Sequence, residues 1–177
     1  MTLHTSSSSS PLNMRIVVMG VSGTGKSTVG AALAQRLGVR YIEGDQYHFE
    51  ENLLKMGKGI PLTDEDRQGW LLVLQSQLRA AAEAGESVVM TCSALKRSYR
   101  ELLREADAQL LFIYLVGTRE EIAARMHQRT GHFMPPSLME SQFRDLEPPS
   151  PDERAYVFSI DMPLEQLVNR IISEMQA

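Results

Sequence analysis

Residues 20–27 have the types and the spacing of a loop that binds phosphate. They read Gly-Val-Ser-Gly-Thr-Gly-Lys-Ser, which matches the pattern G-x-x-x-x-G-K-[ST]. Glycines allow the backbone to curl until several N–H groups point inward at phosphate oxygens. The ammonium group of Lys26 can then reach the β- and γ-phosphates, and the hydroxyl of Ser27 can ligate Mg²⁺. The alternative is a glycine-rich turn that holds no ligand.

The residues around this loop form the context that a phosphate-binding motif requires. Residues 15–19 are a short apolar run rich in β-branched side chains, which predicts a buried strand. Residues 26–37 have apolar positions at helix spacing, and Gly38 follows where a C-terminal cap belongs. We therefore expect ATP and Mg²⁺ as cofactors. The residues predicted to bind them are Gly20, Ser22, Gly23, Thr24, Gly25, Lys26, Ser27, Thr28 and, from a later helix, Arg125.

A carboxylate follows the second predicted strand, which covers residues 40–43. Ligands of open α/β sheets bind at the carboxyl ends of the strands, so Asp45 is expected beside the phosphate loop. There it can accept the proton of an attacking hydroxyl group and orient that group. A helix cap or a turn residue is the alternative. No acidic residue ends the third strand, so Mg²⁺ is expected on Ser27, the phosphates and water, with Asp45 in its outer shell.

Polar and basic residues follow the third predicted strand, residues 87–91. Ser93 lies just past the end of this strand. Lys96 and Arg100 are four residues apart, on one face of a helix predicted over residues 96–105. Together they could hold a carboxylate or a phosphate of the acceptor. A solvated basic helix face is the alternative for Lys96 and Arg100.

Further basic residues gather after the fourth predicted strand. Arg125 and Arg129 could fold over the phosphates and neutralise charge that develops during phosphoryl transfer. We therefore predict a lid near residues 125–147 whose closure excludes water. His132 lies in the same cluster and is counted with the acceptor-binding residues. Surface positions for the arginines, and a capping or packing role for His132, are the alternatives.

Strands and helices alternate along the chain. The strand runs are apolar without alternation, which is typical of strands buried on both faces of a parallel sheet. We therefore predict an α/β protein with the three-layer αβα P-loop kinase fold, a five-stranded parallel sheet and a helical lid. We also expect strands over residues 110–116 and 156–160 and an irregular segment over 46–62. Thr63 is expected to cap a helix that ends near residue 84, and capping boxes at Thr118 and Ser137 are expected to begin two further helices. A final helix is expected from Pro163.

Length and composition limit the remaining choices. The 177 residues fit one domain, residues 14–177, after a stretch over 1–13 that we interpret as a disordered tail or a cloning remnant. Lys and Arg total 18 against 22 for Asp and Glu, which disfavours nucleic acid as a partner. No apolar run approaches the roughly 20 residues of a membrane-spanning helix, so no membrane partner is expected. Cys92 is the single cysteine, which fits a reducing compartment, and we predict a cytoplasmic protein.

Several segments together resemble the gluconokinase family of small P-loop kinases. Many families share the phosphate loop, whereas Cys-Ser-Ala-Leu-Lys and Asp-x-Asp-Arg-x-x-Trp-Leu are much more particular. The matching segments after the loop are Gly44-Asp45 with His48, Asn52 and Lys55-Met56; Pro61-Leu62 with Asp64, Asp66-Arg67 and Trp70-Leu71; Cys92-Ser-Ala-Leu-Lys96 with Tyr99-Arg100; Gly131-His132-Phe133; and Ser141-Gln142-Phe143 with Leu146-Glu147. The resemblance covers nearly the whole chain from Met14 onward.

The resemblance implies ATP-dependent phosphorylation of D-gluconate at its 6-hydroxyl group, by a fold similar to those of shikimate and adenylate kinases. It also implies a homodimer and a mobile lid. Within the site it implies that Asp45 is the base or orienting group, with Arg125 and Arg129 as the adenine-side and lid arginines. With Lys26 from the phosphate loop, Asp45 and Arg129 form the predicted catalytic set. The acceptor-binding residues that the resemblance implies are Asp45, His48, Arg67, Ser93, Lys96 and Arg100.

One position departs from the family's pattern. The family often has His-Pro after the second strand, and this chain has His48-Phe49. Proline fixes its own φ and restrains the residue before it. Its loss is therefore expected to loosen the loop that carries His48.

Two other readings of the chain stay open at this point. The first is another small-molecule kinase, such as a shikimate-type or nucleoside monophosphate kinase. A nucleotide acceptor would require a stacking or apolar pocket for a second base, and the sequence offers no strong candidate for one. The second is a nucleotide-binding module without turnover, which would need neither Asp45 nor a polar acceptor pocket.

Overall fold

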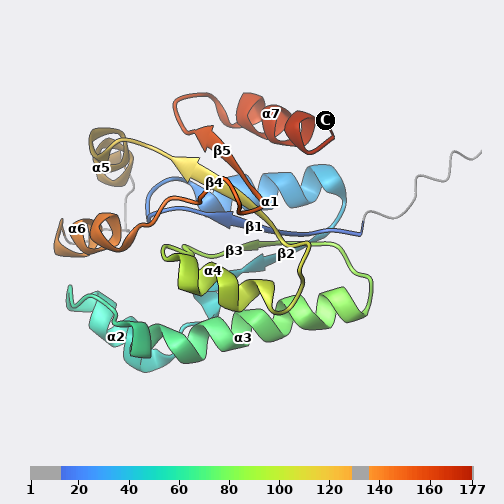
Figure 1. Ribbon diagram of the computed structural model, residues 1–177. Coiled ribbons are helices and arrows are strands. Elements are labelled where there is room, and N and C mark those ends of the chain that lie inside the picture. The colour runs from blue at the N-terminus through green and yellow to red at the C-terminus, as the bar shows by residue number, and fades with distance from the viewer. Residues whose placement is uncertain (1–12, 129–135, 177) are drawn as a thin grey trace, which may run out of the picture.

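Five parallel strands form one sheet in the order β2-β3-β1-β4-β5 (Figure 1). This computed structural model describes residues 13–128 and 136–176, so all of the predicted tail except Asn13 lies outside the described residues. The strands are β1 (Arg15–Met19), β2 (Arg40–Glu43), β3 (Val88–Thr91), β4 (Leu111–Val116) and β5 (Ala155–Ser159). The α/β class and the five-stranded parallel sheet are confirmed.

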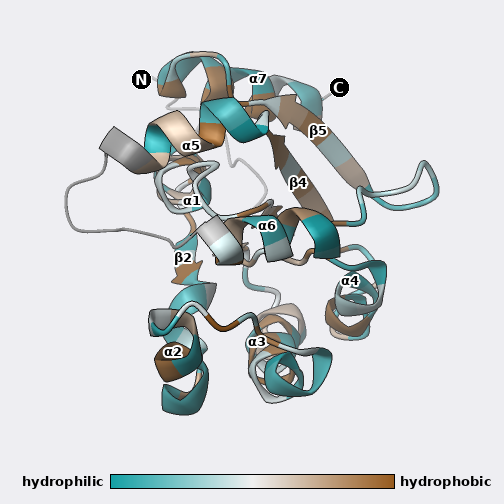
Figure 2. Ribbon diagram, turned by 90° about the vertical axis from the view of Figure 1, so that its left-hand side faces the viewer, coloured by the Kyte–Doolittle hydropathy of each residue, from teal (hydrophilic) through white to brown (hydrophobic). Residues whose placement is uncertain are grey.

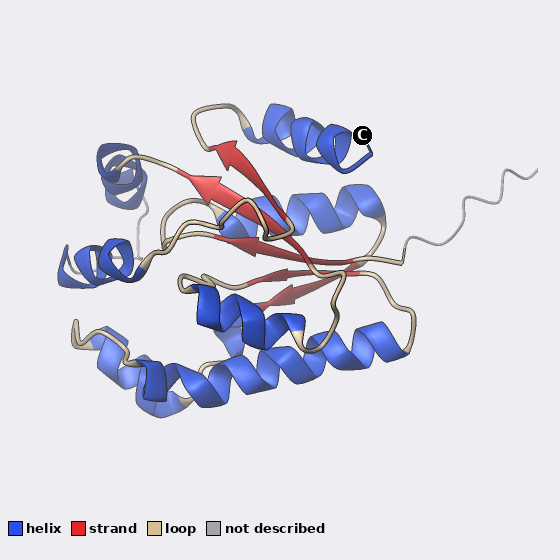
Figure 3. Ribbon diagram, viewed as in Figure 1, coloured by secondary structure: helices blue, strands red, loops and turns tan. Residues whose placement is uncertain are grey.

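Helices cover the sheet on both faces. In Figure 3 the strands lie between two helical layers, with α1 and α7 on one side and α3 and α4 on the other. The helices are α1 (Lys26–Leu37), α2 (Glu50–Gly57), α3 (Asp64–Glu83), α4 (Arg97–Arg104), α5 (Arg119–Gln128), α6 (Pro136–Asp145) and α7 (Leu164–Gln176), with a 3-10 turn over Gly44–Tyr47. The predicted three-layer arrangement is therefore confirmed.

Side chains of the central strand β1 alternate between two cores. Ile16 and Val18 pack in the core beside α1 and α7, whereas Val17 and Met19 pack in the core beside α3 and α4. All four are at most 1% exposed. Both faces of the strand must therefore be apolar, which explains why its sequence shows no polar alternation.

The segment over residues 46–62 was expected to be irregular, and this expectation is wrong. It contains α2, which packs against the start of α3. Lys55 Nζ lies 2.8 Å from Asp66 Oδ1, and Asn52 Nδ2 donates to the Asp66 carbonyl at 2.7 Å. The glycines that suggested an irregular segment do not interrupt α2, because Gly57 is its last residue and Gly59 lies beyond its end.

Of the two capping boxes predicted late in the chain, one forms. At the start of α5 the Thr118 hydroxyl accepts a hydrogen bond from Glu121 N–H at 3.1 Å, and Thr118 N–H donates to the Glu121 carboxylate at 3.3 Å. The box at Ser137 is wrong, because α6 already begins at Pro136. The Ser137 hydroxyl donates instead to the Gly59 carbonyl at 3.2 Å.

The carboxyl ends of the strands meet at one edge of the sheet, because every strand pairing is parallel. Helices α2, α5 and α6 lie beyond this edge in Figure 1. Figure 2 views the molecule from that side and shows α6 in front of the sheet. Within the described residues, no helix combines the length and the apolar character needed to cross a membrane.

Candidate active site

The segment from Gly20 to Gly25 connects β1 to α1 and forms an open cradle. Gly25 precedes α1 with a φ of 90° and, as a glycine, has no side chain that could cap the first helical turn. A Cβ atom at Gly23 would lie 2.9 Å from Ile122 Cγ2 and 2.9 Å from the Met126 sulfur. Only glycine therefore lets α5 pack against the loop. Uncapped N–H groups at a helix start fit phosphate binding.

Two side chains hold the loop in its curled form. Thr24 is 1% exposed, and its hydroxyl donates to the Val21 carbonyl at 2.9 Å. Lys26 Nζ donates to the same carbonyl at 3.1 Å. The Thr24 side chain thus shapes the loop, and its expected contact with phosphate would come from the backbone. Ser27 and Thr28 are exposed on the first turn of α1, where their hydroxyls can meet a metal or a phosphate.

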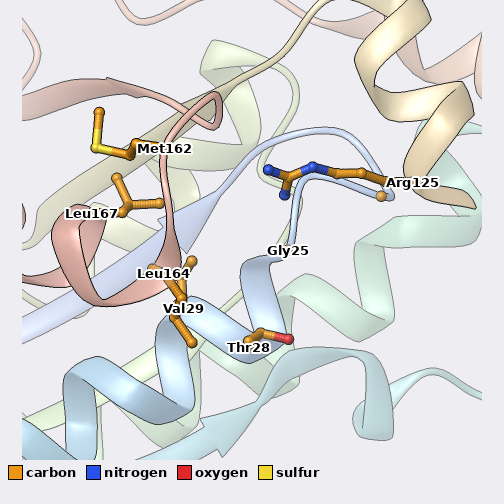
Figure 4. Close-up of a pocket in the computed structure, with 8 residues that line it drawn as sticks. Gly25, Thr28, Val29, Arg125, Met162, Leu164 and Leu167 are labelled. Carbon is orange, nitrogen blue, oxygen red and sulfur yellow. The ribbon is translucent and has the colours of Figure 1, made fainter. Parts of the chain in front are cut away.

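A cavity of about 320 Å³ lies beside the phosphate loop (Figure 4). Its lining is a mixture of polar and apolar groups and consists of Gly23, Gly25, Thr28, Val29, Arg125, Met162, Leu164 and Leu167. The Arg125 guanidinium donates to the Ile160 carbonyl and extends along the loop toward Gly25. A cavity with apolar side chains and a guanidinium group in its lining, next to the phosphate loop, fits a nucleotide base.

Asp45 is carried by the 3-10 turn that follows β2. A Cβ atom at Gly44 would lie 1.9 Å from the Thr91 carbonyl oxygen, so the turn can approach β3 only because residue 44 is glycine. Gly44 N–H donates to Thr91 Oγ1 at 3.1 Å, and its carbonyl accepts from Trp70 Nε1 at 2.8 Å. The Asp45 side chain is 66% exposed. Its backbone is therefore fixed while its carboxylate stays open to an acceptor.

His48 lies directly behind this carboxylate. Its Nε2 atom is 3.8 Å from Asp45 Oδ1, and its side chain is 7% exposed. Its Nδ1 atom is buried without a hydrogen-bond partner among the described residues. Burial lowers the pKa of His48, and the positive charge of Arg67 lowers it further, against the opposing effect of Asp45. The imidazole is therefore neutral at pH 7, so one of its ring nitrogens can donate a hydrogen bond and the other can accept one.

Phe49 occupies the position where the family often has proline. Its φ is −69°, which is the value that proline would impose. Its ring lies against α3, since a Cβ atom at Gly69 would be 2.5 Å from Phe49 Cε2. The geometry therefore does not support the expected loosening of the loop that carries His48.

Two of the cations predicted to bind the acceptor are paired with carboxylates of the protein. Arg67 is 6% exposed, and its Nη1 atom lies 2.8 Å from the Tyr99 hydroxyl and 3.1 Å from Asp145 Oδ2. Lys96 Nζ lies 2.9 Å from Asp64 Oδ1, which also accepts from the Tyr99 hydroxyl. The hydrogen bond to Asp64 raises the pKa of Lys96. Tyr99 thus joins the two cations into one polar cluster.

Arg100 does not join this cluster, contrary to the sequence-based expectation. Its side chain is 0% exposed and forms an ion pair with Glu153, with 2.7 Å between Nε and Oε1. Lys96 is the residue that precedes α4, and it faces Asp64 instead. The spacing of four residues did not place the two cations together, because Lys96 lies outside the helix. Direct contact between Arg100 and an acceptor is therefore not supported.

Ser93 lies between the two halves of the site. It is half-buried, and its carbonyl accepts a hydrogen bond from Gly20 N–H at 3.2 Å. Helix α6 makes a second link, because Ser22 N–H of the phosphate loop donates to Gln142 Oε1 at 2.7 Å. Hydrogen bonds thus connect the phosphate loop to Ser93 and to α6, the helix whose Asp145 pairs with Arg67.

Comparison with known proteins identifies the family. A family model described as shikimate kinase matches residues 22–150. The chain is 46% identical to a gluconokinase from Gluconobacter oxydans, over 92% of this chain and 91% of that protein. It is 43% identical to a probable gluconokinase of Rattus norvegicus, over 91% of this chain and 97% of that protein. A crystal structure of a gluconokinase from Sinorhizobium meliloti has a TM-score of 0.85 at 46% identity and covers 93% of this chain and 92% of its own. The chain belongs to the gluconokinase family.

Some residues of this gluconokinase-family site were not predicted from the sequence. Asp145 was not singled out at all, and Asp64 was named only as part of a matching segment, without a role in the site. The available signal was their position inside matching segments, but their partners Arg67 and Lys96 come from other helices. Two predicted residues, Arg129 and His132, lie outside the described residues.

Proposed function

We propose that this protein transfers the γ-phosphoryl group of ATP to the 6-hydroxyl group of D-gluconate, which gives 6-phospho-D-gluconate. One observation carries the proposal. A phosphate cradle, the open carboxylate of Asp45 and the cluster of Arg67 and Lys96 lie around the same edge of the sheet. Relatives at 43% and 46% identity are named as a probable gluconokinase and a gluconokinase. A sugar acid has both a hydroxyl group and a carboxylate for such a site.

On the acceptor side, Asp45 accepts the proton of the attacking hydroxyl group and orients it. Neutral His48 hydrogen-bonds a sugar hydroxyl through a ring nitrogen, and Ser93 binds another. Arg67 and Lys96 bind the sugar carboxylate, in part by exchanging their contacts with Asp145 and Asp64. Because the cations are already ordered by these partners, little side-chain entropy is lost when the acid binds.

On the nucleotide side, Lys26 and the N–H groups of the cradle bind the β- and γ-phosphates. Ser27 would hold Mg²⁺ together with the phosphates and water. Among the described residues no group of three or more His, Cys, Asp or Glu side chains could hold a metal ion. A site in which the exposed Ser27 hydroxyl is one ligand, and the phosphates and water are the others, needs no such group. Bound Mg²⁺ supplies charge that neutralises the transferred group. Arg125 binds on the adenine side, and we extend the proposal to Arg129 and His132 as lid residues.

The proposal also includes a homodimer, as the family resemblance implies, and a location in the cytoplasm, which the single cysteine favours. Light scattering coupled to size-exclusion chromatography tests the dimer directly. A mass near the 19.8 kDa of one chain would contradict it.

A coupled assay of ADP release tests the activity itself. The acceptors are D-gluconate, other sugar acids, shikimate and AMP, each with ATP and Mg²⁺, and Lys26→Ala is the inactive control. We expect turnover with D-gluconate well above that with every other acceptor. Preferred turnover with shikimate or AMP would retain the kinase and reject gluconate. ATP binding without turnover on any acceptor would favour the nucleotide-binding module.

A further inference from the structure

A fully buried pair of opposite charges lies beneath the acceptor site and has no direct part in the proposed chemistry. The side chains of Arg100 on α4 and Glu153 before β5 are 0% and 1% exposed. Two hydrogen bonds join them, Nε to Oε1 at 2.7 Å and Nη2 to Oε2 at 3.1 Å. Arg104 adds a third contact to Glu153 at 2.8 Å. A buried ion pair is costly to desolvate, and apolar residues of similar volume often replace such pairs without loss of stability. A contribution to stability is therefore a weak explanation for the presence of this buried ion pair.

The guanidinium of Arg100 also binds the backbone of the segment between β3 and α4. Its Nη1 atom donates to the Ala94 carbonyl at 2.8 Å and to the Leu95 carbonyl at 3.2 Å. Glu153 aligns the other side of the same planar group. The fork geometry of arginine thus fixes the direction of two successive carbonyls, which a lysine could not do.

The backbone held in this way is strained. Ala94 has a φ of 47°, and no other non-glycine residue in the described ranges has a positive φ. Side chains with a Cβ atom rarely adopt this region, and such residues persist where surrounding contacts enforce them. Ala94 is also 0% exposed, so the turn cannot relax outward.

This strained turn separates two proposed acceptor-binding residues. We call residues 93–96 the Ala94 turn. It begins with Ser93, whose carbonyl is bonded to Gly20 N–H at 3.2 Å, and it ends with Lys96. A second anchor comes from Glu147, whose N–H donates to the Leu95 carbonyl at 2.7 Å. The direction of the Ala94 and Leu95 carbonyls therefore decides where Ser93 and Lys96 face.

We propose that Arg100 and Glu153 are a positioning pair, which holds the Ala94 turn in its strained form so that Ser93 and Lys96 face the acceptor. This inference rests on the proposed function of those two residues. Arg100 acts through the turn and does not touch the acid.

The test replaces the planar guanidinium group of Arg100 but keeps its positive charge. In Arg100→Lys we expect the KM for D-gluconate to rise about tenfold or more, while the KM for ATP changes less than about twofold. Glycine adopts a positive φ without strain, so adding Ala94→Gly to this variant should restore much of the KM for D-gluconate. Ala94→Gly alone should stay near the parent.

A second buried ion pair provides a matched control. Arg15 and Asp107 are each 8% exposed and lie 2.7 Å apart, with Arg15 at the opposite, amino-terminal edge of the sheet. Arg15→Lys should lower the melting temperature without changing either KM. If Arg100→Lys raised both KM values equally, or if Ala94→Gly failed to restore the value for gluconate, the positioning role would be rejected.

A readout that does not depend on turnover separates this inference from the proposed function. Cys92, the single cysteine, is 1% exposed and immediately precedes the Ala94 turn. Arg100→Lys should speed its labelling by a thiol reagent under native conditions, Ala94→Gly should reverse the effect, and Arg15→Lys should not reproduce it. If the wild-type protein were inactive on gluconate, the proposed function would be rejected. The rate of Cys92 labelling would still show whether Arg100 and Glu153 hold the Ala94 turn. Unchanged labelling in Arg100→Lys would overturn the inference.

Discussion

The imidazole of His48 lies flat against the indole of Trp70, with ring centroids 4.0 Å apart and an angle of 18° between the planes. The same indole donates from Nε1 to the Gly44 carbonyl at 2.8 Å, one residue before Asp45. One side chain of α3 thus supports both the proposed base and the histidine behind it. The stacking also removes water from the imidazole, which disfavours its charged form.

We expect His48 to titrate below its ordinary pKa of 6.5 in the folded protein, because burial disfavours the imidazolium. Since the folded pKa is the lower one, protonation of His48 destabilises the fold as the pH falls below 6.5. NMR titration of the four histidines measures this pKa, and His48→Gln identifies the signal. Trp70→Leu should move the pKa back toward 6.5. A pKa above 6.5 in the parent would contradict the buried, neutral ring.

Asp45→Asn should lower kcat by about 10²–10⁴-fold, with little change in the affinity for gluconate or ATP. The amide keeps the size of the side chain but cannot accept the proton. Steady-state kinetics and equilibrium binding of both substrates measure the two effects separately. Glu50→Gln is the control, because it removes an exposed carboxylate from the start of α2. Equal kcat values for Asp45→Asn and the parent would reject Asp45 as the base.

Lys96→Ala should raise the KM for gluconate at least about tenfold and the KM for ATP much less, because the sugar carboxylate loses its cation. Lys55→Ala is a close match, since Lys55 is 2.8 Å from Asp66 and Lys96 is 2.9 Å from Asp64. Both changes remove one lysine paired with an aspartate in the first turn of α3. We expect Lys55→Ala to leave both KM values near those of the parent. Matching effects of the two variants would place Lys96 outside the acceptor site.

The parent should lose stability in acid through Glu153. Burial alone would raise the pKa of this carboxyl group, but hydrogen bonds from Arg100, from Ser150 N–H and from Arg104 outweigh burial and lower the pKa from 4.5 to about 2. The resulting stability, on the order of 3 kcal/mol, is present above pH 4.5 and is lost as the pH falls toward 2. Urea unfolding at several pH values, compared between the parent and Glu153→Gln, measures it. A difference between the two that stays constant from pH 7 to pH 3 would refute this account.

Features set by neighbouring residues were predicted well from the sequence. Helix α1 has the predicted bounds, because the phosphate loop, the apolar spacing and the cap at Gly38 all lie within a few residues of one another. The α3 cap also formed as predicted, with Asp66 N–H donating to the Thr63 hydroxyl at 3.1 Å. In both cases the interactions that decide the structure are local in the sequence.

Features set by distant partners were not predictable in this way. The four-residue spacing of Lys96 and Arg100 suggested a shared face, but Glu153 lies 53 residues from Arg100 and draws it into the interior. Helix α2 depends on Asp66, 11 residues from Lys55, and on packing against α3. No local pattern contains such contacts, so the partners of these cations could be found only from the structure.

The contact between Gly44 and β3 limits which genetic variants this chain can tolerate. No side chain fits at a position where a Cβ atom would lie 1.9 Å from a neighbouring backbone oxygen. A change from glycine to alanine, mild at most surface sites, would separate the end of β2 from β3 and swing Asp45 away from the phosphate cradle. Residue 44 would therefore behave in a mutational scan like a catalytic position, although it contributes no functional group to the reaction.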